Sequence, residues 1–581
     1  MDERVARLEA VVADLTGRVA DLEARLLRGD HAVTFTRHSE AIHDPLTAVA
    51  EIDAGSVQQW LALVGRTLVV LGGAYFLRAI TESHVVVPQA GVALGLIYGA
   101  PWLVLASRAE GRGAHLDALC HALSTALIGY PLVWEATVRF GVLTPPQSAG
   151  LLAALTGAAL VLASRRQLQR LAWVVTFGAL GSALGLAAAT GAWAPYTLVA
   201  IAVGLATLWL GYLHRWVEIR WPAAFAANLM LFIATGRAGA HGGVASVVWL
   251  QALMLAGYLG SFTIRTVVGS HPIVPFEVVQ SAGALAVAFG GLVYLLSGSS
   301  GGLQILAIVS LLVAVSAYVT AFRFTEVQRP TPNFVFQTIL GFFFTVAGLA
   351  VGAGSVVASA IYVALAAVTL GLARRHDRLT LVLHAALFGI AAAIGSGLLT
   401  NATLAIVTPT AAGVASPGVI PLAALTVLLA IAALPARDTR ERWRYVMPVA
   451  RCVVAALGTW TAAGVIVALA LAALPGSIDQ SQLSTIRTIV LVASAVAVAA
   501  AGWYPAGREA AWLTFPLLLI AGMKLVFVDF LQGRPTTLFA ALAVYGAALI
   551  IAPRMLRRES AGSENPALHR DNVVAAVGRG V

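Results

Sequence analysis

The chain has 581 residues, of which 59% are hydrophobic and only 11% are charged, and its mean hydropathy is +0.86. Soluble domains carry about 25% charged residues, so this composition excludes a water-soluble globular protein. It also excludes a transmembrane β-barrel, because the apolar segments are continuous and do not alternate. The net charge of +10 does not indicate a nucleic-acid partner, because most arginines lie in short loops beside apolar segments, where they set membrane topology.

A heptad pattern in residues 1–28 predicts a short amino-terminal coiled coil. Its seam residues step alternately by three and four: Val5, Leu8, Val12, Leu15, Val19, Leu22 and Leu26. Valine at most a positions of the heptad and leucine at the d positions favour a parallel dimer. We therefore expect a parallel homodimer or a docking site for a cytoplasmic partner through residues 1–28. A lone amphipathic helix lying on the protein or on the membrane is the alternative.

Residues 57–553 predict a multi-span transmembrane domain. Because a bilayer core about 30 Å thick needs about 20 apolar residues per helix, the chain allows about 18 spans, within a range of 16 to 19. The expected fold is all-α, a polytopic membrane protein built of helical hairpins, with a polar linker at 29–56 and a disordered cytoplasmic tail at 554–581. Fifty-five glycines suit close helix packing in lipid.

The predicted spans are 57–79, 87–107, 115–139, 145–163, 169–189, 193–213, 219–235, 244–264, 274–297, 303–323, 332–352, 355–373, 379–399, 417–435, 446–475, 485–504, 508–529 and 535–553. The segment 446–475 is long enough for a tilted or broken helix.

Arginines gather in alternate loops, and this alternation predicts the orientation. Segments such as 108–112 and 374–378 are basic, whereas 297–302, 400–416 and 475–484 on the opposite side carry no basic residue. The positive-inside rule therefore places both termini and the basic loops in the cytoplasm, with the chain in the bacterial cytoplasmic (inner) membrane. The basic turns recur about every 50 to 65 residues, which fits either duplicated hairpins or similar composition without common descent.

Charged residues inside apolar segments are functional candidates, because a charge at the bilayer centre costs about 2.5 to 3.5 kcal/mol on insertion scales. The candidates for a substrate path are Arg66, Arg78, Glu82, Glu135, Arg139, Arg487, Lys524 and Asp529. All except Arg66 are expected at the outer ends of their spans, whereas Arg66 is expected roughly 13 Å deep. We interpret the outer set as a polar cavity for an anionic or sugar-bearing substrate. Snorkelling or structural ion pairing near the interface is the alternative.

The spacing of these residues predicts how they pair. Arg78 with Glu82, and Glu135 with Arg139, are four residues apart and can satisfy each other on one helix. Lys524, the only lysine in the sequence, precedes Asp529 by five residues. Five residues of α-helix turn about 500°, which leaves the two side chains roughly 140° apart. We therefore expect Lys524 and Asp529 each to meet another helix and not each other.

The sequence predicts no catalytic, metal or cofactor site. Cys120 and Cys452 are expected to be small buried hydrophobic residues, and the three histidines of the linker lack the spacing of metal ligands. His121 and His384 lie in spans, where a histidine usually makes a hydrogen bond between helices.

Two stretches carry a family resemblance. WLALVGRTLVVLGGAYFLRAI at 60–80 follows the heptads, and Arg487-Thr488 precedes MKLVFVDF at 523–530 and FAALAVYGAALIIAPRMLRR at 539–558. These segments resemble a bacterial family of multi-spanning membrane proteins, domain of unknown function 2339. The resemblance implies a many-pass protein behind a short coiled coil and implies no activity.

Three functions remain open. Short loops and charges within spans favour a transporter or a flippase-like protein for an amphipathic or anionic envelope substrate. The heptads favour a membrane scaffold or assembly protein of the cell envelope. A membrane-embedded glycosyltransferase or acyltransferase fits less well, because the longest predicted outer loop, 400–416, has no ionisable side chain.

The predicted orientation can be tested with a reporter that is active only in the periplasm. Fused within 297–302, it should be active, because this loop lies opposite the basic loops. The same reporter fused within 374–378 serves as the control and should be inactive. The reverse pattern would overturn the orientation.

Overall fold

The computed structural model describes residues 65, 69–70, 72–83 and 85–563, apart from 326–331, 377–378, 409–413, 415, 435–445, 475–478, 505–509 and 531–534. The predicted coiled coil, most of the linker, Arg66 and most of the carboxy-terminal tail lie outside these residues. Throughout the described ranges the secondary structure is helical and contains no strand, which confirms the all-α prediction. The chain divides into two compact units, with the boundary between Thr190 and Gly191.

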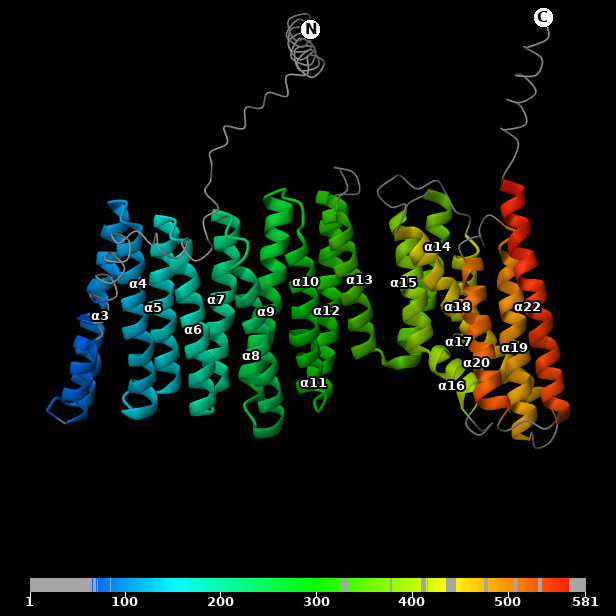
Figure 1. The fold of residues 1–581 in the computed structure, drawn as a ribbon, viewed down its shortest axis with the longest axis horizontal. Helices are drawn as coiled ribbons and strands as arrows, with labels where there is room; N and C mark the ends of the chain where they lie inside the picture. Colours follow the sequence, from blue (N-terminus) through cyan, green and yellow to red (C-terminus); the bar gives the residue numbers. More distant parts are fainter. Residues whose placement is uncertain are drawn as a thin grey trace, which may run out of the picture. The chain divides into compact units, whose positions relative to one another are not determined.

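The first unit consists, in its described part, of helical residues 72–82 and four further helices (Figure 1). These are α3 Pro88–Gly111, α4 His115–Trp134 followed by the π-helical turn η1 Glu135–Arg139, α5 Pro145–Arg166, and α6 Gln169–Thr190. The sequence explains where α5 begins and ends. The side chain of Gln147 accepts a hydrogen bond from the Thr144 amide at 2.9 Å, and the chain leaves the helix through Gln167 in the left-handed conformation.

The second unit holds the remaining helices (Figure 1). In chain order they are α7 Trp193–His214, α8 Arg220–His241, α9 Val244–Thr263, η2 Ile264–Val268, α10 Pro275–Ala284, η3 Leu285–Phe289, α11 Gly290–Leu296, α12 Ser300–Thr320, η4 Ala321–Thr325, α13 Pro332–Gly352, α14 Gly354–His376, α15 Leu379–Gly395, α16 Leu398–Val407, α17 Val419–Ala432, α18 Val446–Ala473, α19 Gln480–Ala501, η7 Ala510–Leu513, α20 Thr514–Lys524, η8 Leu525–Asp529 and α22 Pro535–Ser563. The long segment predicted at 446–475 is one continuous helix, α18.

Within the described residues, 14 helices are long and apolar enough to cross a membrane, or 15 if one bent pair counts as a span. A many-pass membrane protein is thereby supported, and each of the 14 coincides with a predicted span. The four other predicted spans explain the difference from about 18: 57–79, 115–139, 379–399 and 417–435. The first lies mostly outside the described residues, the second is α4 with η1, the third is the bent pair, and the fourth is the shorter helix α17.

The bent pair corrects the predicted loop at 400–416. The chain bends by 61° between Thr380–Gly395 and Leu398–Val407, and α16 occupies the first half of that loop. Gly397 has a φ of +72°, a left-handed conformation that glycine adopts without a steric penalty. The helix therefore stops and restarts in a new direction within two residues. Threonine and asparagine in α16 gave this segment the composition of a loop.

Five π-helical turns interrupt or end the described helices: η1, η2, η3, η4 and η8. Four of these five turns contain a charged residue, for example Arg265 in η2, Arg323 in η4 and Asp529 in η8. A π turn has hydrogen bonds between residues five apart, so it changes which side chains share a face, and such turns are frequent at functional sites. The sequence pattern predicted none of them.

Close packing depends on tyrosines that lie over glycines of a neighbouring helix. In the first unit, the Tyr130 hydroxyl of α4 donates to the Val175 carbonyl of α6 at 3.0 Å, and a Cβ added at Gly178 would lie 2.4 Å from the Tyr130 ring. In the second unit, the Tyr545 hydroxyl of α22 lies 2.4 Å from a Cβ added at Gly522 of α20. Small residues let helices approach closely in lipid, where burial of apolar surface does not drive their association.

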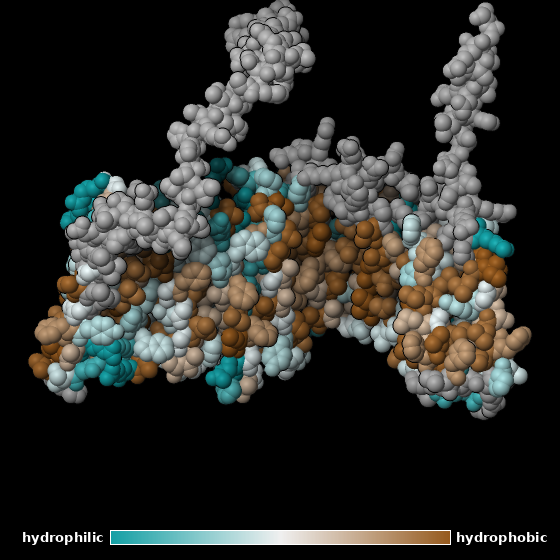
Figure 2. Space-filling view, in the orientation of Figure 1, coloured by the Kyte–Doolittle hydropathy of each residue, from teal (hydrophilic) through white to brown (hydrophobic). Residues whose placement is uncertain are grey.

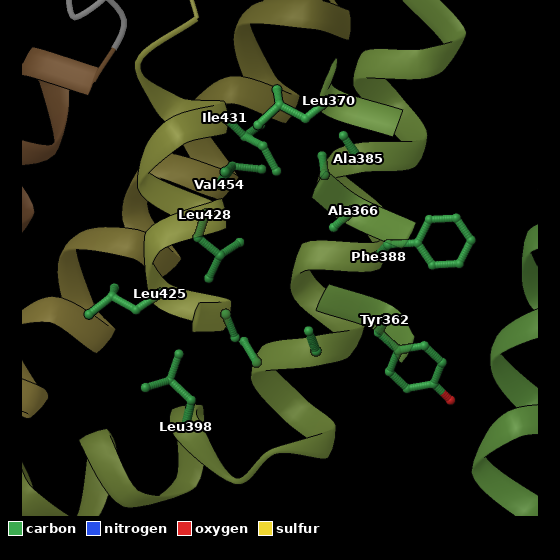
Figure 3. Packing of buried hydrophobic residues seen from close by; sticks show 14 of the residues in the cluster. Tyr362, Ala366, Leu370, Ala385, Phe388, Leu398, Leu425, Leu428, Ile431 and Val454 are labelled. Carbon is green, nitrogen blue, oxygen red and sulfur yellow. The ribbon is translucent and has the colours of Figure 1, made fainter. Parts of the chain in front are cut away.

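A core of buried side chains joins α14, α15, α16, α17 and α18 (Figure 3). Each of these helices contributes a member to the cluster, for example Tyr362 of α14, Phe388 of α15, Leu398 of α16, Leu428 of α17 and Val454 of α18. The face shown in Figure 2 has apolar residues over the middle of the helices and polar residues toward their ends. Large apolar side chains on the surface are expected where helices face lipid.

His384 confirms the role predicted for a histidine in a span. Its Nδ1 lies 2.8 Å from the Thr380 carbonyl on its own helix, and its Nε2 lies 3.2 Å from the Thr338 carbonyl of α13. The side chain thus connects α15 to α13.

Substitution of Gly178 by alanine should destabilise the first unit by about 1 to 3 kcal/mol, because the new methyl group overlaps the buried Tyr130 ring. Gly181→Ala on the same helix is the matched control, since nothing lies within 4 Å of a Cβ there. The control should be neutral or stabilising, because alanine favours a helix by about 0.5 to 1 kcal/mol over glycine. Thermal unfolding in detergent would measure both, and equal melting temperatures would contradict the packing argument.

Candidate functional site

The charged residues predicted for the substrate path fall into two clusters, each within one compact unit. The amino-terminal ion cluster consists of Arg78, Glu82, Glu135 and Arg139. The carboxy-terminal cluster contains Arg487, Lys524 and Asp529, together with Ser484 and Thr488, which the sequence did not single out. Arg66, the eighth candidate, lies outside the described residues.

The amino-terminal ion cluster joins helical residues 72–82 to η1. Arg78 Nε lies 2.7 Å from Glu82 Oε1, which confirms the first predicted local pair. The second predicted local pair, Glu135 with Arg139, is replaced by pairs between the two helical segments. Arg78 NH1 lies 2.7 Å from Glu135 Oε1, and Arg139 NH1 lies 2.8 Å from Glu82 Oε1. The π turn that holds Glu135 and Arg139 alters the α-helical geometry on which the local prediction relied.

The charges of this cluster balance, with two arginines and two glutamates. The side chains of Arg78 and Glu82 are about one-third exposed, and that of Arg139 is 50% exposed. Glu82 comes after the end of the predicted first span. The hydrogen bond from Arg78 lowers the pKa of the Glu82 carboxyl group. A neutral, partly exposed cluster of this kind fits structural ion pairing better than the binding of a charged substrate.

The carboxy-terminal cluster corrects the prediction that Lys524 and Asp529 do not pair. Lys524 Nζ lies 2.6 Å from Asp529 Oδ1, and their side chains are 13% and 4% exposed. The reason is η8, which begins directly after Lys524 and ends at Asp529. In a π turn, residues five apart are hydrogen-bonding neighbours along the helix, so the 140° separation of an α-helix does not apply. Each side chain also contacts α19, as predicted.

Helix α19 supplies two hydroxyl groups to this ion pair. Thr488 Oγ1 donates to Asp529 Oδ2 at 2.6 Å, and Ser484 Oγ donates to Asp529 Oδ1. Lys524 Nζ donates to the Ser484 carbonyl at 2.8 Å, and lies 2.9 Å from Ser484 Oγ and 2.8 Å from Thr488 Oγ1. The only sequence signal was the four-residue spacing of the two hydroxyl residues, which puts them on one face of α19.

Arg487 of α19 reaches the end of the broken helix. Its Nε donates to the Ala405 carbonyl at 2.7 Å and its NH1 to the Thr408 carbonyl, so the guanidinium group caps the carboxyl end of α16. The negative end of a helix dipole and the free carbonyl groups there favour a cation. Arg487 is only 4% exposed, and among the described residues its NH2 atom has no hydrogen-bond partner.

The formal charges of the carboxy-terminal cluster therefore sum to +1, from Arg487 and Lys524 against Asp529. Among the described residues, Arg487 forms no ion pair with a carboxylate. An arginine with an unpartnered donor has the chemistry to bind an anionic group, because the planar guanidinium matches carboxylate and phosphate oxygens.

A third site of paired charges, which is buried, was not predicted. Glu277, fully buried near the start of α10, accepts hydrogen bonds from Arg265 of η2 and from the Tyr212 hydroxyl of α7 at 2.7 Å. Its other carboxylate oxygen accepts from the Val274 amide at 2.9 Å. The bonded carboxylate joins α7, η2 and α10. A second buried arginine, Arg220 of α8, lies over the Phe276 ring beside Glu277, and its Nε has no hydrogen-bond partner among the described residues, so this site also has one positive charge more than its carboxylate balances.

Comparison with known proteins gives no match: no family model matches the chain, and no curated protein matches it significantly. The resemblance to the domain of unknown function 2339 therefore stays a prediction. The case for a function rests on the geometry of the carboxy-terminal cluster.

Asp529→Asn should destabilise the protein by about 3 to 5 kcal/mol, because it leaves the buried Lys524 ammonium group without its counter-charge. Glu82→Gln is the matched control. It also removes a carboxylate from cationic partners, but at a site where both partners are at least one-third exposed, so it should change stability by at most about 1 kcal/mol. Melting temperatures in detergent would compare the two variants. A larger effect at Glu82 would contradict the ranking of the clusters.

Proposed function

We propose that this protein moves an anionic, amphipathic substrate of the cell envelope within or across the bacterial cytoplasmic membrane, with both termini in the cytoplasm. One observation carries the proposal. Arg487 is buried between apolar helices, forms no ion pair with a described carboxylate, and has a buried NH2 donor without a hydrogen-bond partner among the described residues. A charged group in such a place is expensive, so it is expected to serve a function.

The electrostatics favour a substrate with a negative headgroup. The cluster's excess of +1 would be compensated by one phosphate or carboxylate group bound at Arg487, beside Lys524. Carbonyl groups at the carboxyl end of α16 accept hydrogen bonds from Nε and NH1 of Arg487. The remaining nitrogen, NH2, is therefore the donor that such a group would meet. Because the surrounding core of α19, α20 and α22 is apolar, an acyl chain could lie against these helices while the headgroup meets Arg487.

Two backbone features support movement as against a fixed scaffold. The α15–α16 break makes α16 a short half-helix, and Arg487 binds its far, carboxyl end. Transporters build their sites at the ends of discontinuous helices. The π turn η8 adjoins the same cluster, and conversion of a π turn to α-helix would separate Lys524 from Asp529. In the proposed function, this local conversion would give the cluster a second arrangement.

The proposal can be tested with the full chain reconstituted in liposomes that contain fluorescent phosphatidylglycerol. A membrane-impermeant reductant added outside quenches only the outer-leaflet probe, so the rate of further quenching measures movement between leaflets. The wild type should accelerate this movement. Arg487→Gln should slow it about tenfold or more, the factor given by a loss of 1.4 kcal/mol in binding the headgroup.

Three controls complete the experiment. Gly181→Ala, a substitution in open space, should retain the wild-type rate. Fluorescent phosphatidylcholine should move more slowly than phosphatidylglycerol, because its headgroup carries no net negative charge. A chain lacking residues 1–28 should also retain the rate, since the proposed movement does not use the predicted coiled coil. If Arg487→Gln complements a deletion strain while the truncated chain fails to do so, the scaffold function is favoured and the proposed one is wrong.

A further inference from the structure

Four oxygen atoms surround the Lys524 ammonium group and form what we term the oxygen cage. They are the Ser484 carbonyl at 2.8 Å, Ser484 Oγ at 2.9 Å, Thr488 Oγ1 at 2.8 Å and Asp529 Oδ1 at 2.6 Å. Helix α19 contributes three of the four atoms, and η8 contributes the carboxylate. Lys524 brings the cation but none of the ligands.

The composition of the oxygen cage is that of a site for a hard monovalent cation. Carbonyl, hydroxyl and carboxylate oxygens replace the hydration shell of such ions, and the cage contains no nitrogen or sulfur ligand. Its single carboxylate compensates one positive charge. A divalent ion would leave a further positive charge uncompensated near Arg487, so the local charge selects against it.

The oxygen cage does not depend on Lys524 to hold its shape. Asp529 is fixed by the hydroxyl groups of Ser484 and Thr488, both of which donate to it. Lys524, in contrast, reaches the cage from the preceding α20 along a flexible four-carbon stem. If η8 converted to α-helix, Lys524 would turn away by roughly 140° relative to Asp529 and leave the carboxylate with its hydroxyl partners.

We propose that the oxygen cage is a binding site for Na⁺ or K⁺, in which the Lys524 ammonium group is the built-in occupant and a free ion takes its place when Lys524 turns away. The inference deepens the proposed function, because such an exchange would couple substrate movement to an ion gradient. Only this coupling role rests on the proposed function. The binding of the ion does not.

The test removes the built-in occupant. Full-length Lys524→Ala is purified in detergent, and its melting temperature is measured in NaCl, KCl and choline chloride at equal concentrations. Sodium or potassium should raise the melting temperature by about 2 °C or more over choline, with saturation, because an ion that binds only the folded state stabilises it. Methylammonium chloride, which imitates the end of the lysine side chain, should also stabilise the variant. Wild type should respond equally to all the salts, because Lys524 fills the cage.

Two further variants give the controls. Lys524→Ala with Asp529→Asn removes the carboxylate and should abolish the difference between the salts. Lys524→Ala with Thr488→Val removes one hydroxyl ligand and should require a higher ion concentration for half of the shift. Lys524→Gln repeats the measurement with a longer neutral side chain, in case the alanine variant cannot be purified.

The site is refuted if the lysine variants melt at the same temperature in all three salts, if the difference between salts persists without the carboxylate, or if neither variant folds in any of them. These outcomes can be distinguished from failure of the proposed function. Lipid movement by wild type without any ion effect on Lys524→Ala overturns the cation site alone. An ion effect without lipid movement leaves the site in place and overturns the proposed function.

Discussion

The need to compensate a charge among apolar helices is the constraint on which the carboxy-terminal part of this protein depends. Lys524 and Asp529 form one ion pair, and α19 completes it with a carbonyl and two hydroxyl groups. An ion pair withdrawn from water is stable only if its remaining donors and acceptors are also bonded. The pairing of α19 with η8 follows from this requirement, and so does the local departure from α-helical geometry.

The same constraint ranks the three charged sites. The amino-terminal ion cluster has equal numbers of positive and negative groups, and the Glu277 site pairs its carboxylate with Arg265. Around Arg487, carbonyl groups of the broken helix replace a counter-ion, and one donor has no partner among the residues that the structure describes. A balanced site holds helices together. A buried arginine with an unpartnered donor, as at Arg487, has the electrostatic property that recognition of an anionic group requires.

Helix packing and helix interruption complement each other in the second unit. Tyrosines over glycines and an alanine-rich core fix most helices closely, as at Tyr545 and Gly522. The π turn η8 belongs to the carboxy-terminal cluster, and the break at Gly397 begins the half-helix α16, whose carboxyl end binds Arg487. Rigid helices around two local irregularities are suited to a small rearrangement at the cluster without unfolding of its surroundings.

The sequence alone determined the apolar character, the fold class, the positions of 14 apolar helices and which charged residues lie in or beside them, because hydrophobic length and the rarity of charge within apolar segments are properties of the chain itself. Only the tertiary structure decided which charges meet. The rotation between Lys524 and Asp529 depends on a π turn that no residue pattern signals, and the partners of Arg487 lie about 80 residues away on a helix that resembled a loop. Partnership between buried polar groups is set by the angle and depth at which separate helices pack, and local sequence does not encode either quantity.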